Sequence, residues 1–272
     1  MSAFLRNIGQ VSKAEAVSLG TRFGRRRVGG KLFRNIGPLR GISGASSGGY
    51  QGALVAGYRA WWRGDGYVSG TWTDRSANGY NLTEATNPPA LISADANFNG
   101  LPTVDFDGTN DILGGTTLSN LIAADAFHIF GVVRAESFGA ADGSGANQRG
   151  VFADTGGYVG FGFGSSKLEG FNYDGTTDYT GNPVVDLSTL YGFHLRHDAG
   201  TLYLNVSGKT EASVVSGNTS DMTNAFRVGV AYDGSPFFDG QIGDLGVYNV
   251  VKSGADLTTN LAYYADTYGI TW

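Results

Sequence analysis

Cysteine is missing from this 272-residue chain, and other chemically reactive residue types are rare. Without cysteine there is no disulfide, no thiolate metal site and no cysteine nucleophile. Only three histidines occur, and only five glutamates, at positions 15, 84, 136, 169 and 211. Retaining glycosidases bring two carboxyls to about 5–5.5 Å. No two of these glutamates are close in sequence, so an enzyme is not expected, although aspartates paired across loops stay open.

Charge and long apolar runs are also limited. Charged residues make up 16% of the chain, against 44 glycines, 16 phenylalanines and 14 tyrosines. Glycine at this density without a three-residue period fits neither a collagen nor a long-helix protein. Runs of β-branched and aromatic residues alternate with Gly, Asn, Asp and Ser turns, which is typical of an all-β sandwich. Such a domain can hold about 200–250 residues around one core.

Four segments, in this order, resemble a known superfamily. Trp72–Gly79 (WTDRSANG) is followed by Val104–Asp111 (VDFDGTND). Phe238–Asn249 (FDGQIGDLGVYN) and Tyr264–Ile270 (YADTYGI) lie near the end of the chain. Together they resemble the laminin-G-like jelly-roll domains of the concanavalin A-like lectin and glucanase superfamily, as found in phage virion proteins. The resemblance implies an all-β, two-sheet antiparallel jelly-roll sandwich over residues 50–272, with a C-terminal helix.

The residue pattern adds detail to this expectation. Asp74, Ser76 and Asn78–Gly79 are predicted turn residues, because short polar side chains bond nearby backbone and glycine allows positive φ. Ser253–Tyr268 is predicted to be a helix, with its first residue as the cap and Gly269 as the stop. Alternation and flanking turns predict strands at Thr103–Phe106, Phe127–Arg134, Tyr158–Phe163, Tyr191–His197, Thr201–Ser207 and Phe237–Tyr248.

No segment has the pattern of an export or membrane signal. The N-terminal region lacks the apolar core of about 7–15 residues that a signal peptide needs. The longest clearly apolar run, near Phe127–Val133, is far short of the ~20 residues of a membrane helix. We therefore expect a soluble protein made in the cytoplasm. A glycan-recognition fold that is not exported is an unusual combination, which a virus particle released by lysis would explain.

Positive charge is concentrated at one end of the chain. Residues 1–49 hold nine lysines and arginines against one acid, Glu15, which gives a net charge of +8. The remaining residues hold ten basic and 23 acidic side chains, a net −13. This asymmetry predicts a separate basic arm, residues 1–49, that ends in a Gly/Ser linker and has its own partner. An acidic protein surface or a nucleic acid would fit it, and a solvated tail is the alternative.

The arm also contains a short repeat. Phe4-Leu-Arg-Asn-Ile-Gly9 recurs as Leu32-Phe-Arg-Asn-Ile-Gly37. Two copies are too few for a solenoid, so they would fill two equivalent pockets on a symmetric partner, unless the similarity arose by chance. Arginine suits such contacts because its planar fork bonds carboxylates or phosphates bidentately. The predicted assembly residues are Phe4, Arg6, Ile8, Arg25, Arg26, Arg27, Phe33, Arg34 and Ile36.

Sugar-binding candidates are aromatic residues with polar neighbours. They are Trp61, Trp62, Trp72, and Tyr173 beside Asp174. The resemblance favours burial for the early tryptophans at the edge of the sandwich. The Gly-rich loops 139–150 and 174–182 suit a variable rim, as they would suit any unspecialised loop.

Metal binding has one candidate. The resemblance implies that a calcium ion beside the sugar site is possible, and Asp107, Asn110 and Asp111 carry the oxygens that a hard cation prefers. An ordinary turn is the alternative, and no other cofactor is expected. His194 and His197 are predicted to face opposite sides of one strand, and His128 to stand alone at a core edge, so a histidine metal site is not expected.

These observations favour a bacteriophage virion structural protein, such as a capsid decoration, tail or fibre component. The arm would bind other virion proteins, in a symmetric homo-oligomer or in many copies, while the lectin-like domain meets host-surface glycans. Nucleic-acid contact through Arg25, Arg26 and Arg27 is less favoured, and no membrane span is expected. A free carbohydrate-binding module or adhesin is the first alternative. A glycoside hydrolase is the second, and it would need two convergent carboxylates in a cleft.

Overall fold

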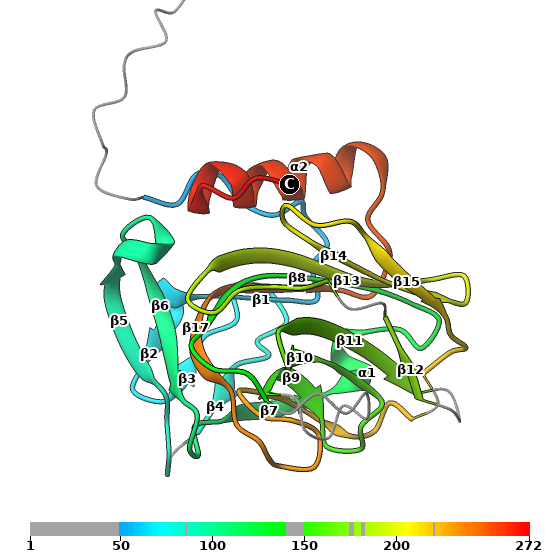
Figure 1. The fold of residues 1–272 in the computed structure, drawn as a ribbon, viewed down its shortest axis with the longest axis horizontal. Coiled ribbons are helices and arrows are strands. Elements are labelled where there is room, and N and C mark those ends of the chain that lie inside the picture. The colour runs from blue at the N-terminus through cyan, green and yellow to red at the C-terminus, as the bar shows by residue number, and fades with distance from the viewer. Residues whose placement is uncertain (1–48, 85, 140–148, 174–176, 181–182, 220) are drawn as a thin grey trace, which may run out of the picture. The chain divides into compact units, whose positions relative to one another are not determined.

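The computed structural model describes residues 49–272, apart from residues 85, 140–148, 174–176, 181–182 and 220. Within this range two antiparallel sheets pack face to face, and helix α2 (Gly254–Tyr268) lies on the outer side of the first sheet (Figure 1). This confirms the predicted two-sheet antiparallel sandwich and its C-terminal helix. The predicted assembly residues lie outside the described residues: Phe4, Arg6, Ile8, Arg25, Arg26, Arg27, Phe33, Arg34 and Ile36.

The first sheet has eight strands among the described residues. Its spatial order is β15-β14-β13-β8-β17-β6-β5, and β1 pairs with β17 off this path. The strands are β1 Ala60–Arg63, β5 Ala90–Asp95, β6 Leu101–Asp107, β8 Ala126–Ala135, β13 Leu190–Asp198, β14 Thr201–Val206, β15 Ala212–Val215 and β17 Asp239–Tyr248. Strand β17, far along the chain, thus lies between β8 and β6 and ties early and late segments together.

The second sheet has nine strands in the described part of the chain, in the order β12-β11-β10-β9-β16-β7-β4-β3-β2. They are β2 Tyr67–Val68, β3 Thr71–Trp72, β4 Leu82–Thr83, β7 Leu113–Thr117, β9 Arg149–Asp154, β10 Val159–Gly164, β11 Lys167–Tyr173, β12 Thr177–Tyr179 and β16 Ala225–Val228. Three short helical turns lie between strands: η2 Gly64–Gly66, η3 Ala96–Phe98 and α1 Leu118–Leu121.

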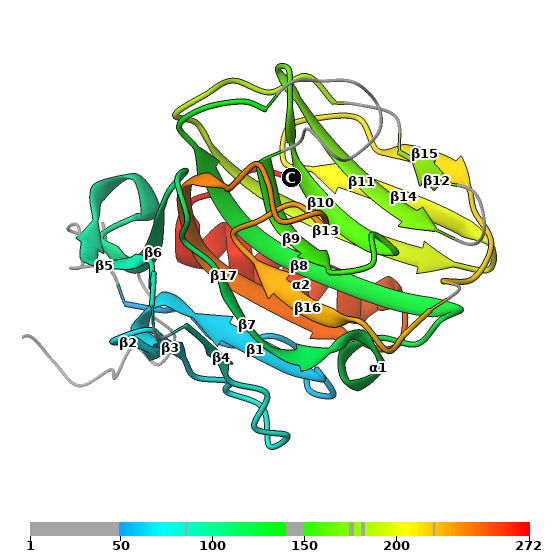
Figure 2. The same ribbon diagram turned by 90° about the horizontal axis from the view of Figure 1, so that it is seen from below.

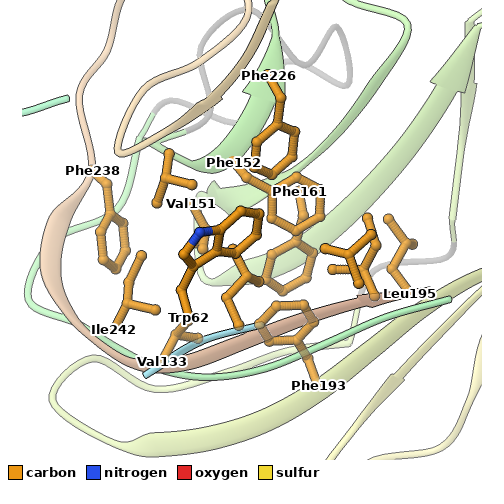
Figure 3. Close-up of a cluster of buried hydrophobic side chains, with 14 of the residues drawn as sticks. Trp62, Val133, Val151, Phe152, Phe161, Phe193, Leu195, Phe226, Phe238 and Ile242 are labelled. Carbon is orange, nitrogen blue, oxygen red and sulfur yellow. The ribbon is translucent and has the colours of Figure 1, made fainter. Parts of the chain in front are cut away.

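Aromatic side chains from both sheets fill the space between them (Figure 3). Trp62 of β1 stacks on Phe226 of β16 with ring centroids 6.0 Å apart, and Phe161 of β10 stacks on Phe193 of β13 at 4.0 Å. All four are buried. Full burial of such a side chain stabilises the folded state by roughly 1.5–3 kcal/mol relative to exposure. The sandwich core is therefore an aromatic one, in keeping with the composition.

Strand β10 shows why glycine is so frequent. Phe161 and Phe163 point into the core, and the glycines that alternate with them face the other side of the sheet. A Cβ on Gly160 would lie 2.2 Å from the ring of Phe171, which covers this glycine from the neighbouring strand. Only glycine leaves room for that ring.

Helix α2 forms a third layer. In the view from below it lies behind the strands (Figure 2). Its buried tyrosines, Tyr263, Tyr264 and Tyr268, join a second hydrophobic cluster on the outer face of the first sheet. Gly269 ends the helix with a left-handed φ of 73°, as predicted. Ser253 stands at the N-cap position but makes no side-chain capping bond, so the predicted cap is wrong in that respect.

The missing side-chain cap is explained locally, because the residue after Ser253, Gly254, has a left-handed φ of 53° that departs from helical geometry.

Among the described residues no helix is long and apolar enough to cross a membrane.

Candidate functional site

The Trp72–Gly79 motif builds a turn. Both carboxylate oxygens of Asp74 accept backbone N–H bonds, from Trp61 at 2.9 Å, Ser76 at 2.8 Å and Tyr80 at 2.9 Å. Asp74 is buried. It therefore fastens this turn to β1, which is the turn role predicted for it.

The three candidate tryptophans are all buried. Trp62 and Trp72 are fully buried, and Trp61 is 4% exposed. The indole N–H of Trp62 donates to the carbonyl of Tyr80, and that of Trp72 donates to the carbonyl of Arg63. The indole N–H of Trp61 donates to the carboxylate of Asp244. None of them offers the exposed ring that a sugar platform requires, because each fills the edge of a core.

The structure does not test the other two sugar-binding candidates, Tyr173 and Asp174. Strand β11 ends at Tyr173, whose side chain lies outside the described residues, as does all of Asp174.

Asp107, Asn110 and Asp111 form one turn after β6. Asp111 accepts the backbone N–H of Asp107 at 2.8 Å, and Asp107 accepts that of Thr109 at 2.8 Å. Burial raises the pKa of Asp111 above its usual value, which opposes the ionised form that a cation needs. In the described part of the chain no three His, Cys, Asp or Glu side chains converge as a metal site. We therefore expect the turn role for these residues, rather than the calcium site that is the alternative.

Two of the histidines form a buried pair. His128 Nε2 lies 3.0 Å from His194 Nδ1, across the β8–β13 pairing. The prediction that His128 stands alone is therefore wrong, because the strand register places His194 beside it. The backbone N–H of Lys252 donates to His128 Nδ1, so His128 carries its proton on Nε2 and donates it to His194.

Burial lowers the pKa of both members of this pair, that of His194 to about 4. The pair is therefore neutral near pH 7. His197 turns to the other face of β13 and stacks on Phe127, with its ring nitrogens near the carbonyls of Asp125 and Ser216. This confirms that His194 and His197 face opposite sides of the strand.

Among the Asp and Glu side chains of the described residues, the one whose pKa burial raises most is one that the sequence did not single out. Asp244 of β17 is fully buried beneath α2. Its carboxylate accepts bonds from the indole of Trp61 at 2.8 Å and from the hydroxyl of Tyr263 at 2.6 Å. The hydroxyls of Tyr264 and Tyr268 lie at 3.3 and 3.4 Å. We call these five residues the Asp244 cluster.

Opposing effects set the ionisation of Asp244. Burial raises the pKa of Asp244 to about 7, while the donors around it and the nearby Arg63 favour its charged form. Arg63 itself pairs with Asp65 at 2.6 Å and lies over the ring of Tyr50, 3.6 Å from its centroid. The cluster is thus a buried carboxylate that changes charge near neutral pH.

A small surface cavity opens beside the cluster. Its volume is about 190 Å³. It lies between the chain at Gln51–Ala53 and helix α2, and we call it the α2 hollow. Its lining residues are Gln51, Gly52, Ala53, Thr259, Ala262, Tyr263 and Asp266.

The wall of the α2 hollow is fixed by hydrogen bonds to the helix. The backbone N–H of Gln51 donates to the hydroxyl of Thr267, and that hydroxyl donates to the carbonyl of Gln51, both at 3.3 Å. The N–H of Val55 donates to the side-chain oxygen of Asn260 at 2.8 Å. Tyr263 connects the two features, since it lines the hollow while its hydroxyl bonds Asp244. The hollow therefore has a pre-formed shape, with one aromatic residue among amide, hydroxyl and carboxylate groups.

No family model matches the chain, and no curated protein matches it. Solved structures do. Domain 4 of AbnA, an extracellular arabinanase from Geobacillus stearothermophilus in complex with arabinotriose, is 11% identical, with a TM-score of 0.57 over 78% of this chain and 98% of that one.

Two larger proteins are similar in part. Botulinum neurotoxin type C, whose cell entry depends on two ganglioside molecules, gives a TM-score of 0.53 at 12% identity, over 77% of this chain and 51% of that one. A Trypanosoma rangeli sialidase gives 0.53 at 12% identity, over 78% and 33%. The chain thus spans about half of the toxin chain and a third of the sialidase. At these identities the likeness shows a shared β-sandwich fold.

Proposed function

We propose that the sandwich is a glycan-binding module. The observation that carries the proposal is the match to nearly the whole of arabinanase domain 4, an isolated domain whose structure contains arabinotriose. The neurotoxin matched over a similar share of this chain depends on gangliosides. Sugars are therefore the ligand class common to both similar structures.

Titration of the full-length protein with soluble glycans tests this proposal. We expect arabinotriose or another oligosaccharide to bind in isothermal titration, with a dissociation constant between micromolar and millimolar. A broad glycan array on which no sugar binds above background would contradict it.

We further propose that binding occurs without cleavage. Only one carboxylate, Asp266, lines the α2 hollow, whereas retaining hydrolysis needs a pair about 5–5.5 Å apart. The full-length protein should not cleave laminarin, agar-type or bacterial surface glycans above background. Specific cleavage that disappears when a single aspartate is changed would show an enzyme instead.

The finer proposal is that this module belongs to a bacteriophage virion structural protein, a capsid decoration, tail or fibre component. It is supported by the charge division of the chain, +8 in residues 1–49 and −13 in the rest, and by the repeated segment in the basic part. The basic arm would bind acidic surfaces of other virion proteins, and the acidic sandwich would remain available to host glycans.

The virion role can be tested on phage particles purified from a host culture that produces this protein. Antibodies raised against the full-length protein should label a discrete site on the particle in electron microscopy. A protein lacking residues 1–49 should be expressed but not incorporated. If the protein is found free in the lysate and never on particles, it is a free carbohydrate-binding module or adhesin.

A further inference from the structure

The α2 hollow has the size of a single sugar ring. Pockets for drug-sized ligands have volumes of about 300–1,000 Å³, and this hollow has about 190 Å³. A chain of several sugar residues would not fit inside it. One terminal or branching residue would, with the rest of the glycan over the surface.

Its chemistry suits a neutral, hydroxyl-rich ligand. The hydroxyl of Thr259 donates to the carbonyl of Ala255 at 2.9 Å, which leaves its oxygen lone pairs to accept a ligand hydroxyl. Asp266 is exposed on the same helix and accepts as well. The amide of Gln51 can both donate and accept. Ala53, Ala262 and Tyr263 supply the apolar part of the lining.

Charge excludes one class of sugar. The lining contains one carboxylate and no lysine, arginine or histidine. An acidic sugar such as sialic acid would meet the carboxylate of Asp266 with no cation in the lining to pair with, and like charges in a partly desolvated site repel.

We infer that the α2 hollow binds one neutral sugar residue, a pentose or hexose, and rejects acidic sugars. The inference rests on the proposed glycan-binding function and names its site and ligand class. This site differs from every sugar-binding position that the sequence suggested. Its lining comes from opposite ends of the described chain, Gln51–Ala53 and helix α2.

Two variants of the full-length protein test the inference with arabinotriose and a sialylated trisaccharide as probes. Asp266→Ala removes the carboxylate of the hollow. Asp256→Ala is the matched control, because Asp256 is an exposed aspartate of the same helix that pairs with Lys252 and does not line the hollow. Both variants should keep the wild-type melting temperature.

We expect arabinotriose to bind the wild-type protein and the Asp256→Ala control equally, and the Asp266→Ala variant at least about tenfold more weakly. The sialylated probe should not bind any of them. Arabinotriose binding that survives Asp266→Ala, or preferential binding of the sialylated probe, would overturn the hollow as the site and leave the proposed function standing. If neither these probes nor any array glycan binds, both proposals fail.

Discussion

Tyr263 donates its hydroxyl to Asp244 across 2.6 Å and so joins helix α2 to the middle of the first sheet. The bond is buried. Three other donors, from Trp61, Tyr264 and Tyr268, are aimed at the same carboxylate. A single side chain of β17 therefore holds β1 and two turns of the terminal helix in place.

Replacing Asp244 with asparagine should remove one part of the pH dependence of stability. Burial raises the pKa of Asp244 from 3.8 to about 7, so between these values the folded state holds a proton that the unfolded state has released. The stability that this group contributes is complete below pH 3.8 and is lost as the pH rises to about 7. Urea unfolding at about pH 5 and about pH 7.5 measures it.

Over that interval the wild-type protein should lose on the order of 1–3 kcal/mol more free energy of unfolding than Asp244→Asn, since one pKa unit corresponds to about 1.4 kcal/mol. Equal losses in both proteins would show that Asp244 is already ionised in the fold at pH 5.

Replacing His194 with glutamine should reduce the loss of stability on acidification, whereas Asp244→Asn reduces the loss as the pH rises. Burial lowers the pKa of His194 from 6.5 to about 4, so the unfolded state takes up a proton in this interval and the folded state does not. The stability is present above pH 6.5 and is lost as the pH falls toward 4. The His194→Gln variant should therefore lose less stability than the wild type on acidification. A steeper loss in the variant would contradict this assignment.

Gly160→Ala should destabilise the sandwich by about 1–3 kcal/mol, the usual effect of overpacking. The new Cβ would lie 2.2 Å from the ring of Phe171. Gly114→Ala is the control, because Gly114 lies in a strand of the same sheet and its nearest neighbour would be 3.6 Å away. Thermal unfolding of both variants measures the difference. Similar melting temperatures would mean that Phe171 moves aside at little cost.

Calcium at millimolar concentration should leave the melting temperature unchanged. A ligand that binds only the folded state raises it, but Asp107 and Asp111 already accept backbone N–H bonds within their own turn. A thermal melt with and without calcium checks this. A rise that disappears in Asp107→Asn would restore the turn as a calcium site.

The two-sheet jelly roll was what the resemblance implied, while local patterns predicted the strands and turns well because each depends on neighbours in sequence. Alternation predicted the strands, Gly269 predicted the helix end, and the short spacing from Asp74 to Ser76 predicted their turn. These features need no knowledge of distant segments.

The sites depend on distant segments, so the same patterns missed them. Trp61 and Asp244 are 183 positions apart, and His128 and His194 are 66 apart. Their meeting follows from the order and register of β1, β17, β8 and β13. One signal was available, because an aspartate amid the apolar residues of β17 must find partners if it is buried. The α2 hollow had no such signal.

The hydrogen bonds at the start of the sandwich have a mechanical consequence. Tension applied through the chain before Tyr50 would reach Gln51 and Val55 first, which are bonded to Thr267 and Asn260 of α2. That helix is in turn held by Tyr263 to Asp244 in the middle of the sheet. A pull on the N-terminal side is thus transmitted to the last helix of the chain, so the first and the last segments of the sandwich bear it together.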